Sequence, residues 1–309
     1  MTGIRILATG KAVPKRKVTN DDMAKIVDTS DEWIKQRTGM SVRHHVSDGE
    51  NHTMLAEQAA RAAIERANIN KDDIGVVIVC TVSADYYSPS AACLIQGRLG
   101  LKKDVIAFDL GAGCSGFVFG LETIRALMMA RNEKYGLLIG AEVLSKKMDM
   151  TDRGTCVLFG DGAAAAVVEL SDKLYTSVIG VDGDEEMINI KTPNGYIHMD
   201  GQGTYKFAVA TVPKVIEQVV KDAGLTYDDI DYYVMHQANL RIIESIAKKV
   251  KQPMDKFIVN IEKYGNTSAA SVGLALDEAF EEGRIKPGDK VLICAFGAGR
   301  TWGAVVVEM

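Results

Sequence analysis

The chain has 309 residues, of which 47% are hydrophobic and 25% are charged. This length fits one large or two ordinary globular domains with a sizeable core. The net charge of −5 carries no polyanion-binding signature, so no nucleic-acid partner is expected. No signal peptide and no run of about 18 apolar residues occurs, so no membrane span is expected. Five scattered cysteines without metal-ligand spacing predict reduced thiols, no zinc site and a cytoplasmic location.

Strands alternate with helices in the first half of the chain. Residues 53–67 fit an amphipathic helix, with Thr53 as its expected N-cap. Three short apolar runs are typical of buried parallel strands, and they cover residues 75–80, 105–110 and 137–141. Another helix starts just after Cys114. Its apolar residues recur at helical spacing, at Phe117, Leu121, Ile124 and Met128.

The second half repeats the order of the first. An Asp-Asp-Ile triplet leads into the strand that ends at Cys80, and the same triplet leads into a strand that ends at His236. Each half then has a helix, one from Cys114 and one from Asn266, and closes with a glycine-rich turn before a β-branched strand. The repeat predicts an α/β fold in which two duplicated βαβ-rich halves pack as one layered unit. We place these halves at residues 1–170 and 171–309.

One segment fits neither half. The residues from about Asp182 to Lys206 are rich in Asp, Gly, Asn and His, which predicts an inserted loop or flap. The helical pattern that follows, over residues 207–223, contains Pro213. We therefore expect that helix to kink or restart at the proline.

Cys114 stands in the segment DLGAGCSGF, where a strand ends, small residues make a sharp turn and a helix begins. A thiol at a helix N-terminus lies at the positive end of the macrodipole, which stabilises its thiolate. The glycines around it leave room for a substrate to approach the sulfur. The alternative is a small buried hydrophobic residue, which is our interpretation of the other four cysteines.

Two polar residues of the second half lie at element boundaries. His236 directly follows a buried strand, and the carboxyl ends of parallel strands line the ligand crevice of α/β folds. Asn266 opens a small-residue helix at the place that Cys114 has in the first half. A packed core histidine and an ordinary N-cap are the structural alternatives. Together the three residues supply a nucleophile, a proton handler and an amide donor that pseudo-twofold packing can bring to one crevice.

Over nearly its whole length the chain resembles the β-ketoacyl-acyl-carrier-protein synthase III family of thiolase-like condensing enzymes. Six segments in the same order carry the resemblance. They are DTSDEWIKQRTGM (28–40), the turn around Cys114, TDRGTCVLFGDGA (151–163), HQANLRII (236–243), GNTSAAS (265–271) and FGAGRTWG (296–303).

The resemblance implies a thiolase-like fold and a cytoplasmic homodimer that starts fatty-acid synthesis. Cys114 would take an acyl group from acyl-CoA. His236 and Asn266 would then polarise the thioester of malonyl-acyl-carrier-protein, so that carbon dioxide leaves and the carbanion attacks the acyl-cysteine. No metal or other cofactor is implied, because both thioesters are substrates.

The resemblance also implies binding residues around this site. CoA and substrate contacts would fall on Thr29, Trp33, Arg37, Arg153, Phe159, Gln202 and Ala298. A local basic patch would steer the acidic carrier protein to the mouth of the site. Its members would be Lys206, Arg241, Lys248 and Lys249. Ordinary packing for the tryptophan and solvated helix faces for the charged residues are the alternatives.

Three positions depart from the family pattern. Ser88 stands where many relatives carry a Phe that reaches the partner's acyl pocket, which predicts a primer longer or more branched than acetyl. Ala298 and Arg300 replace a glycine and an aromatic residue in the closing loop. The Ala298 methyl falls where a backbone amide is expected to bind the acyl oxyanion, and Arg300 would contact an anionic or polar substrate.

Other functions remain open on sequence alone. A related thiolase-fold acyltransferase or condensing enzyme for a specialised, secondary-metabolite starter unit would share the fold but differ in its acyl donor. A thiol hydrolase would release free acid from a thioester. A non-catalytic scaffold would keep the fold without the chemistry.

Overall fold

Two five-stranded sheets form the frame of the molecule, and a computed structural model describes them over residues 3–191 and 195–309. The strands of the first sheet are, in order, β1 (Gly3–Ala12), β7 (Gly162–Ser171), β6 (Tyr135–Glu142), β4 (Ile74–Cys80) and β5 (Ile106–Leu110). Those of the second are β8 (Tyr175–Val181), β14 (Thr301–Glu308), β13 (Lys290–Gly297), β11 (Tyr232–Met235) and β12 (Phe257–Ile258). The predicted boundary between residues 170 and 171 therefore falls at the end of β7.

The two sheets repeat each other strand by strand. In the first, β7 is antiparallel to both β1 and β6, whereas β4 is parallel to both β6 and β5. In the second, β14 is antiparallel to β8 and β13, whereas β11 is parallel to β13 and β12. The predicted fold of two duplicated halves is therefore confirmed.

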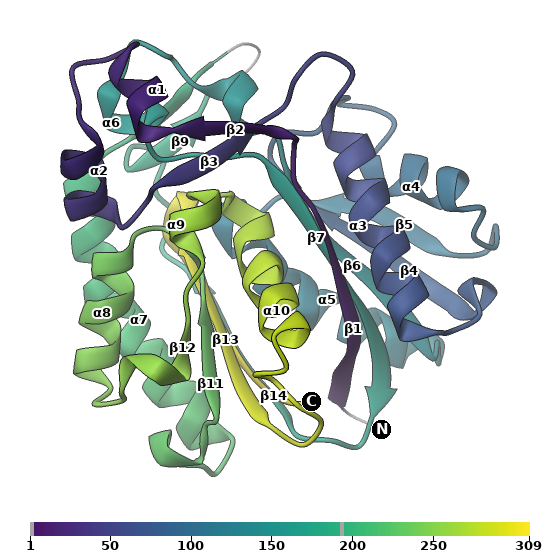
Figure 1. Ribbon diagram of the computed structural model, residues 1–309. Helices are drawn as coiled ribbons and strands as arrows, with labels where there is room; N and C mark the ends of the chain where they lie inside the picture. Colours follow the sequence, from purple (N-terminus) through teal and green to yellow (C-terminus); the bar gives the residue numbers. More distant parts are fainter. Residues whose placement is uncertain (1–2, 192–194) are drawn as a thin grey trace.

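Helices fill and cover the sheets in layers (Figure 1). Between the sheets lie α5 (Gly116–Arg131) and α10 (Ser271–Glu281), which share one apolar core with both of them. The outer face of the first sheet carries α3 (His52–Ala67) and α4 (Ala91–Leu99). The outer face of the second carries α7 (Gly201–Asp222) and α8 (Leu240–Lys249). The predicted apolar stripe of α5 is fully buried in the central layer.

Short elements gather at the end of the sheets where β5 and β12 finish (Figure 1). They are β2 (Arg16–Thr19), α1 (Asn20–Ala24), α2 (Asp31–Thr38), β3 (Val42–His45), α6 (Arg153–Cys156), β9 (Ile188–Ile190), β10 (Ile197–Met199) and α9 (Ile261–Tyr264). A one-turn 3-10 helix precedes each central helix: Gly113–Ser115 before α5 and Ser268–Ala270 before α10. Among the described helices, none has the length and apolar character needed to cross a bilayer.

The cap of α3 and the start of α7 differ from the prediction. The N-cap of α3 is Asn51, whose side chain accepts from Met54 N at 2.9 Å, while Thr53 bonds Asp85 instead. In the segment predicted as an inserted loop or flap, residues 192–194 lie outside the described residues, and β9 and β10 pair antiparallel. Helix α7 begins inside this segment, at Gly201 rather than at residue 207. The early start has a local cause, because the Asp200 side chain caps the first turn.

Helix α7 runs through Pro213 without a restart, so of the predicted kink or restart the restart is wrong. A proline has no N–H to donate to the carbonyl four residues earlier, which here belongs to Val209. Lys249 of α8 donates to that carbonyl oxygen at 2.5 Å. The neighbouring helix therefore satisfies the group that the proline leaves without a donor.

The two 3-10 turns also correct the expected equivalence of Cys114 and Asn266. Gly113 and Ser268 open these turns, and both have left-handed φ values, of 52° and 48°. When these positions are aligned, Asn266 corresponds to Gly111. Asn266 is thus equivalent to a position three residues before Cys114, although the side chains of Cys114 and Asn266 lie around the same space.

Candidate active site

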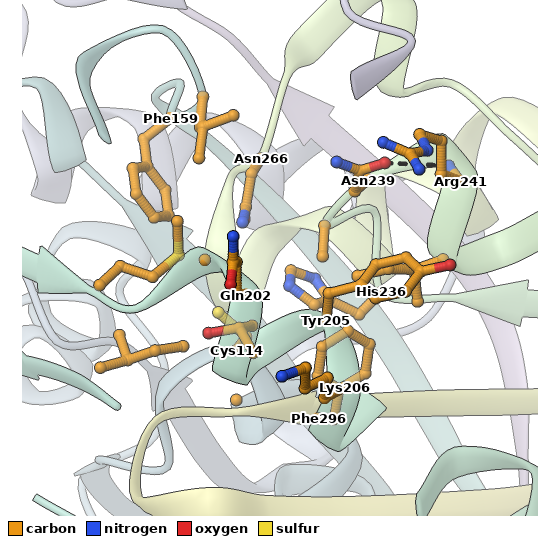
Figure 2. A pocket seen from close by; sticks show the side chains of 18 of the residues that line it. Cys114, Phe159, Gln202, Tyr205, Lys206, His236, Asn239, Arg241, Asn266 and Phe296 are labelled. Carbon is orange, nitrogen blue, oxygen red and sulfur yellow. Dashed lines mark hydrogen bonds between the residues drawn. The ribbon is translucent and has the colours of Figure 1, made fainter. Parts of the chain in front are cut away.

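Three predicted residues meet at the end of the sheets where the short elements gather. Figure 2 shows the side chains of Cys114, His236 and Asn266 around one space. All three line a cavity of about 390 Å³. They come from the turn after β5, the end of β11 and the segment before α10. The predicted crevice between the halves is therefore present.

Cys114 lies close to the loop that closes the second sheet. A Cβ on Gly297 would stand 2.9 Å from both the backbone nitrogen and the Cβ of Cys114, so only glycine fits there. Removal from water raises the pKa of the Cys114 thiol to about 12, although a hydrogen bond with Ser268 acts in the other direction. Burial therefore outweighs the groups that stabilise a thiolate, and the resting residue is a thiol.

Two neighbours hold the ring of His236 in place. Its Nδ1 lies 2.6 Å from the Ser271 hydroxyl, and Phe296 packs edge-on at a centroid distance of 5.4 Å. The ring is almost fully buried, and burial lowers the pKa of His236 to about 3. The imidazole is therefore neutral at physiological pH, with Nδ1 engaged and Nε2 as its other hydrogen-bonding atom.

Asn266 is fixed by its backbone between the two halves. Its N–H donates to Leu158 O at 2.9 Å, and its carbonyl accepts from Gly160 N at 3.0 Å. The side-chain Oδ1 accepts from Ser268 N at 2.9 Å. Because Oδ1 is engaged, Nδ2 is the donor end of the amide.

A second cavity, of about 540 Å³, also reaches Cys114. Apolar side chains make up most of its wall, including those of Val82, Leu144, Phe159, Ile188, Ile190 and Ile197. Phe159 lines both cavities, and Ala298 lines the second. Cys114 thus stands where the two cavities meet.

Glu142 is a buried residue beside the cysteine that the sequence analysis missed. It ends β6, and its carboxylate accepts from Val82 N at 3.2 Å and from the hydroxyls of Thr81, Ser83 and Ser268. Burial raises its pKa to about 7. Its position in the sequence could have revealed it, because Glu142 directly follows the predicted strand at residues 137–141 in the same way as His236 follows its own predicted strand.

Four of the residues expected at the CoA site, Thr29, Trp33, Arg37 and Arg153, line neither cavity. The Arg153 guanidinium stacks over Trp33 at 5.1 Å from the ring centroid. Asn239, which lines the first cavity, donates to the carbonyl of Arg37 at 3.0 Å. The Thr29 hydroxyl is buried without a partner. Gln202, in contrast, lines the first cavity itself, as Figure 2 shows.

The four predicted docking residues separate into two groups. Lys206 and Arg241 line the first cavity, and Arg241 lies over the Tyr205 ring at 5.9 Å. Lys248 and Lys249 lie near the end of α8 and do not line that cavity. Lys249 has the structural contact to Val209 described above, which sequence alone does not reveal.

The three departures from the family pattern have different outcomes. Ala298 lies beside the cysteine turn, with its Cβ 3.3 Å from the place where a Cβ on Gly113 would be. The expected substrate contact of Arg300 is wrong, because its guanidinium pairs with Asp182 at 3.2 Å and Asp184 at 3.0 Å. Ser88 is exposed and lines neither cavity of its own chain.

Within residues 3–191 and 195–309, no cluster of three His, Cys, Asp or Glu side chains has a metal-site arrangement. The five cysteines are all free thiols. The polar groups at the site are thus a thiol, a neutral imidazole, a carboxamide and a buried carboxylic acid.

Comparisons with known proteins agree along the whole chain. The family model described as 3-oxoacyl-[acyl-carrier-protein (ACP)] synthase III matches residues 108–183, and the model of its C terminal part matches residues 220–309. A β-ketoacyl-[acyl-carrier-protein] synthase III of Clostridium beijerinckii is 45% identical, with all of both chains aligned.

Solved structures give the same result. The 3-oxoacyl-[acyl-carrier-protein] synthase III of Aquifex aeolicus superposes with a TM-score of 0.95 at 42% identity, covering 99% of this chain and 100% of that one. The corresponding enzyme of Thermus thermophilus superposes with a TM-score of 0.93 at 40% identity, covering 98% of each chain.

Proposed function

Because this chain belongs to the β-ketoacyl-[acyl-carrier-protein] synthase III family, and is an acyl-transferring condensing enzyme, we propose that Cys114 is its acyl carrier. The observation that carries this proposal is the position of Cys114 at the junction of two cavities. Both cavities have mainly apolar walls, but the first also carries His236 and Asn266, whose hydrogen-bonding groups suit a thioester. The second carries aliphatic side chains, among them Leu144 and Ile197, that suit an acyl chain. A nucleophile at their junction can take the acyl group from one side and hold it on the other.

The first half-reaction loads the cysteine. Acyl-CoA binds with its thioester in the first cavity and its nucleotide at the rim, where Trp33 and Arg153 stack on each other. The sulfur of Cys114 attacks the thioester carbonyl, and CoA leaves as a thiol. The acyl chain then occupies the second cavity, with the backbone amide of Ala298 at its carbonyl oxygen.

The second half-reaction joins two carbons. Malonyl-acyl-carrier-protein replaces CoA, guided by Lys206 and Arg241 at the mouth. Its thioester oxygen accepts from His236 and Asn266, which stabilises the enolate formed as carbon dioxide leaves. That carbanion attacks the acyl-cysteine, and the β-ketoacyl product remains on the carrier.

The hydrogen bonds around His236 support its role as a donor. Gln237 N donates to Ser271 Oγ at 3.4 Å, so the Ser271 hydroxyl can give its own proton to His236 Nδ1. In that tautomer Nε2 carries the proton. Nε2 of His236 and Nδ2 of Asn266 are then two neutral donors for one oxygen. A neutral pair suits malonate chemistry, because no carboxylate at this point repels the substrate.

We propose that the enzyme works as a cytoplasmic homodimer without a metal or other cofactor. The reduced cysteines support the location. The edge strand β5 and the neighbouring exposed loop support the dimer, since Tyr86 and Tyr87 are 58% and 85% exposed in the single chain. Ser88 belongs to this loop, so its predicted effect on primer size requires the partner subunit.

The experiment is intact-protein mass spectrometry after incubation with acetyl-, isobutyryl- and octanoyl-CoA, followed by malonyl-acyl-carrier-protein. We expect one acyl mass on the wild type, none on Cys114→Ala, and discharge into a β-ketoacyl product. Cys93→Ala is the matched control, because Cys93 is the exposed thiol. Adducts that persist in Cys114→Ala would overturn the assignment, and a strong acetyl preference would contradict the prediction from Ser88.

A further inference from the structure

A buried carboxylic acid stands one side chain away from the proposed nucleophile. Glu142 is fully buried, yet it has no cationic partner among the contacts described for its carboxylate. Three hydroxyls and one backbone N–H donate to it instead. Burying a carboxylate is costly unless it is hydrogen-bonded, and apolar packing would serve stability at least as well. The arrangement therefore points to a use for the acid.

Ser268 joins this acid to the thiol. Its hydroxyl donates to Glu142 Oε1 at 3.1 Å and lies near enough to the Cys114 thiol to lower the pKa of that thiol. Ser268 and Cys114 both line the second cavity. The Ser268 hydroxyl therefore lies between Cys114 and Glu142, where it can relay a proton.

The backbone at Ser268 is strained in a way that favours a role for its side chain. Its φ of 48° lies in the left-handed region, which is unfavourable for a residue with a Cβ. The equivalent position of the first half has the same conformation but is Gly113, with a φ of 52°. Glycine meets this backbone requirement without strain, so a serine here indicates that the hydroxyl is needed.

Acylation of Cys114 needs a proton acceptor. The resting group is a thiol, because burial raises its pKa to about 12. His236 is a poor acceptor, because burial lowers its pKa to about 3 and its Nδ1 is engaged with Ser271. Burial has the opposite effect on Glu142, whose pKa of about 7 suits a general base at neutral pH.

We propose that Glu142, acting through Ser268, accepts the Cys114 proton when the cysteine is acylated. The thiol S–H bond breaks as sulfur bonds to the acyl carbon, and its proton moves to Ser268 Oγ. The Ser268 hydroxyl proton moves in the same step to Glu142 Oε1. The reverse transfer returns one proton to the departing CoA thiolate, which leaves as a thiol. This inference rests on the proposed function of Cys114.

Other titratable groups lie near Glu142 on the elements packed against it. They are Cys80 of β4, Asp109 of β5, His52 of α3 and Cys114 itself. Burial raises the pKa of Cys80 and lowers that of His52, so both are neutral near pH 7. Asp109 caps α4 through Ala91 N and Ala92 N, at 2.7 and 2.8 Å.

The test is the rate of a single acyl transfer to Cys114, measured by rapid quench and mass spectrometry between about pH 5.5 and 9. For the wild type we expect the rate to rise with pH and level off near 7, the pKa of Glu142. Glu142→Gln and Ser268→Gly should be slower by about 10²-fold at pH 7, the lower range for general-base catalysis. Their rates should instead rise without a plateau as the thiol itself ionises.

Three controls separate this role from a structural one. Asp161→Asn removes another fully buried carboxylate held by backbone and serine donors, and should keep the wild-type pH profile. Ser268→Gly relieves the backbone strain, so loss of folding does not explain its slower acylation. Decarboxylation of malonyl-acyl-carrier-protein should be unchanged in Glu142→Gln, because that step uses His236 and Asn266.

Two results would overturn the inference: acylation by both variants with the wild-type rate and pH profile, or an equal loss of decarboxylation and acylation. A wild type that forms no acyl-Cys114 would instead show that the proposed function itself is wrong.

Discussion

The two halves of the molecule share a strand order but fill one equivalent position with different residues. The eight-residue strand β6 of the first half corresponds to the eight-residue strand β13 of the second, so their last residues, Glu142 and Gly297, are equivalent. Both positions lie beside the turns that precede the central helices. The first half places a buried acid there, surrounded by hydroxyls, whereas the second places a glycine against the Cys114 turn.

The turns that contact these two positions are equivalent as well. Ser268, in the turn before α10, donates to Glu142, and Cys114, in the turn before α5, packs on Gly297. Burial raises the pKa of Glu142 to about 7, while burial beside Phe296 keeps the imidazole of His236 neutral. In the proposed mechanism, one duplicated frame thus gives a proton acceptor beside the nucleophile and a neutral donor beside the substrate carbonyl.

The sharpest test of this division separates the two half-reactions. His236→Ala and Asn266→Ala should each lower condensation by about 10²–10³-fold, the usual cost of an oxyanion donor, while Cys114 still takes up the acyl group. Acyl-enzyme mass and product formation are measured on the same sample. His198→Ala is the control, because that histidine is exposed and lines neither cavity at Cys114. If both half-reactions were slowed equally, the proposal that the two halves of the molecule serve different half-reactions would be wrong.

The halves should also respond to pH with opposite signs. The pKa of Glu142 rises from 4.5 to about 7 on folding, so it contributes stability below pH 4.5 that is lost as pH rises to 7. The pKa of His236 falls from 6.5 to about 3, so it contributes stability above pH 6.5 that is lost as pH falls. Between pH 5 and 8 the two effects oppose each other.

Removing one of these groups should leave the pH dependence of the free energy of unfolding that the other group causes. For each protein we take the change in the free energy of unfolding between pH 5 and pH 8. This change should be about 2 kcal/mol more positive in Glu142→Gln than in the wild type, and about 2 kcal/mol more negative in His236→Gln. Urea unfolding at both pH values measures this. Slopes of the same sign in the two variants would contradict the assigned directions.

The sequence predicted the fold because the repeat is visible in local patterns, which can be recognised without knowing how the elements pack. Short apolar strands, the Asp-Asp-Ile triplets and the helix after Cys114 all depend on local composition. Side chains at strand ends were predictable for the same reason, and Glu142 was missed although it directly follows such an apolar run, at residues 137–141. The contacts of Lys249 and Arg300 join segments far apart in the chain, and no local pattern records them.

A smaller comparison concerns the two left-handed positions. Gly113→Ala should lower the free energy of unfolding by about 1–2 kcal/mol, because its φ of 52° disfavours a Cβ. The added Cβ would also lie 3.3 Å from that of Ala298. Ser268→Gly should be neutral or slightly stabilising, since relief of the same strain offsets the lost hydrogen bond to Glu142. Denaturant melts measure both, and a strongly destabilised Ser268→Gly would mean that the hydroxyl matters mainly for folding.

The outer helices give the last and smallest test. Helix α3 covers the first sheet without a proline, whereas α7 covers the second with Pro213 inside it and Lys249 at the carbonyl of Val209. Lys249→Met should cost about 1 kcal/mol, because that carbonyl loses its donor. Adding Pro213→Ala should recover most of this, since the new N–H can bond Val209 within the helix. A double-mutant cycle in urea measures the coupling. If Lys249 served only carrier docking, the two changes would be additive in stability, and Lys249→Met would weaken carrier-protein binding alone.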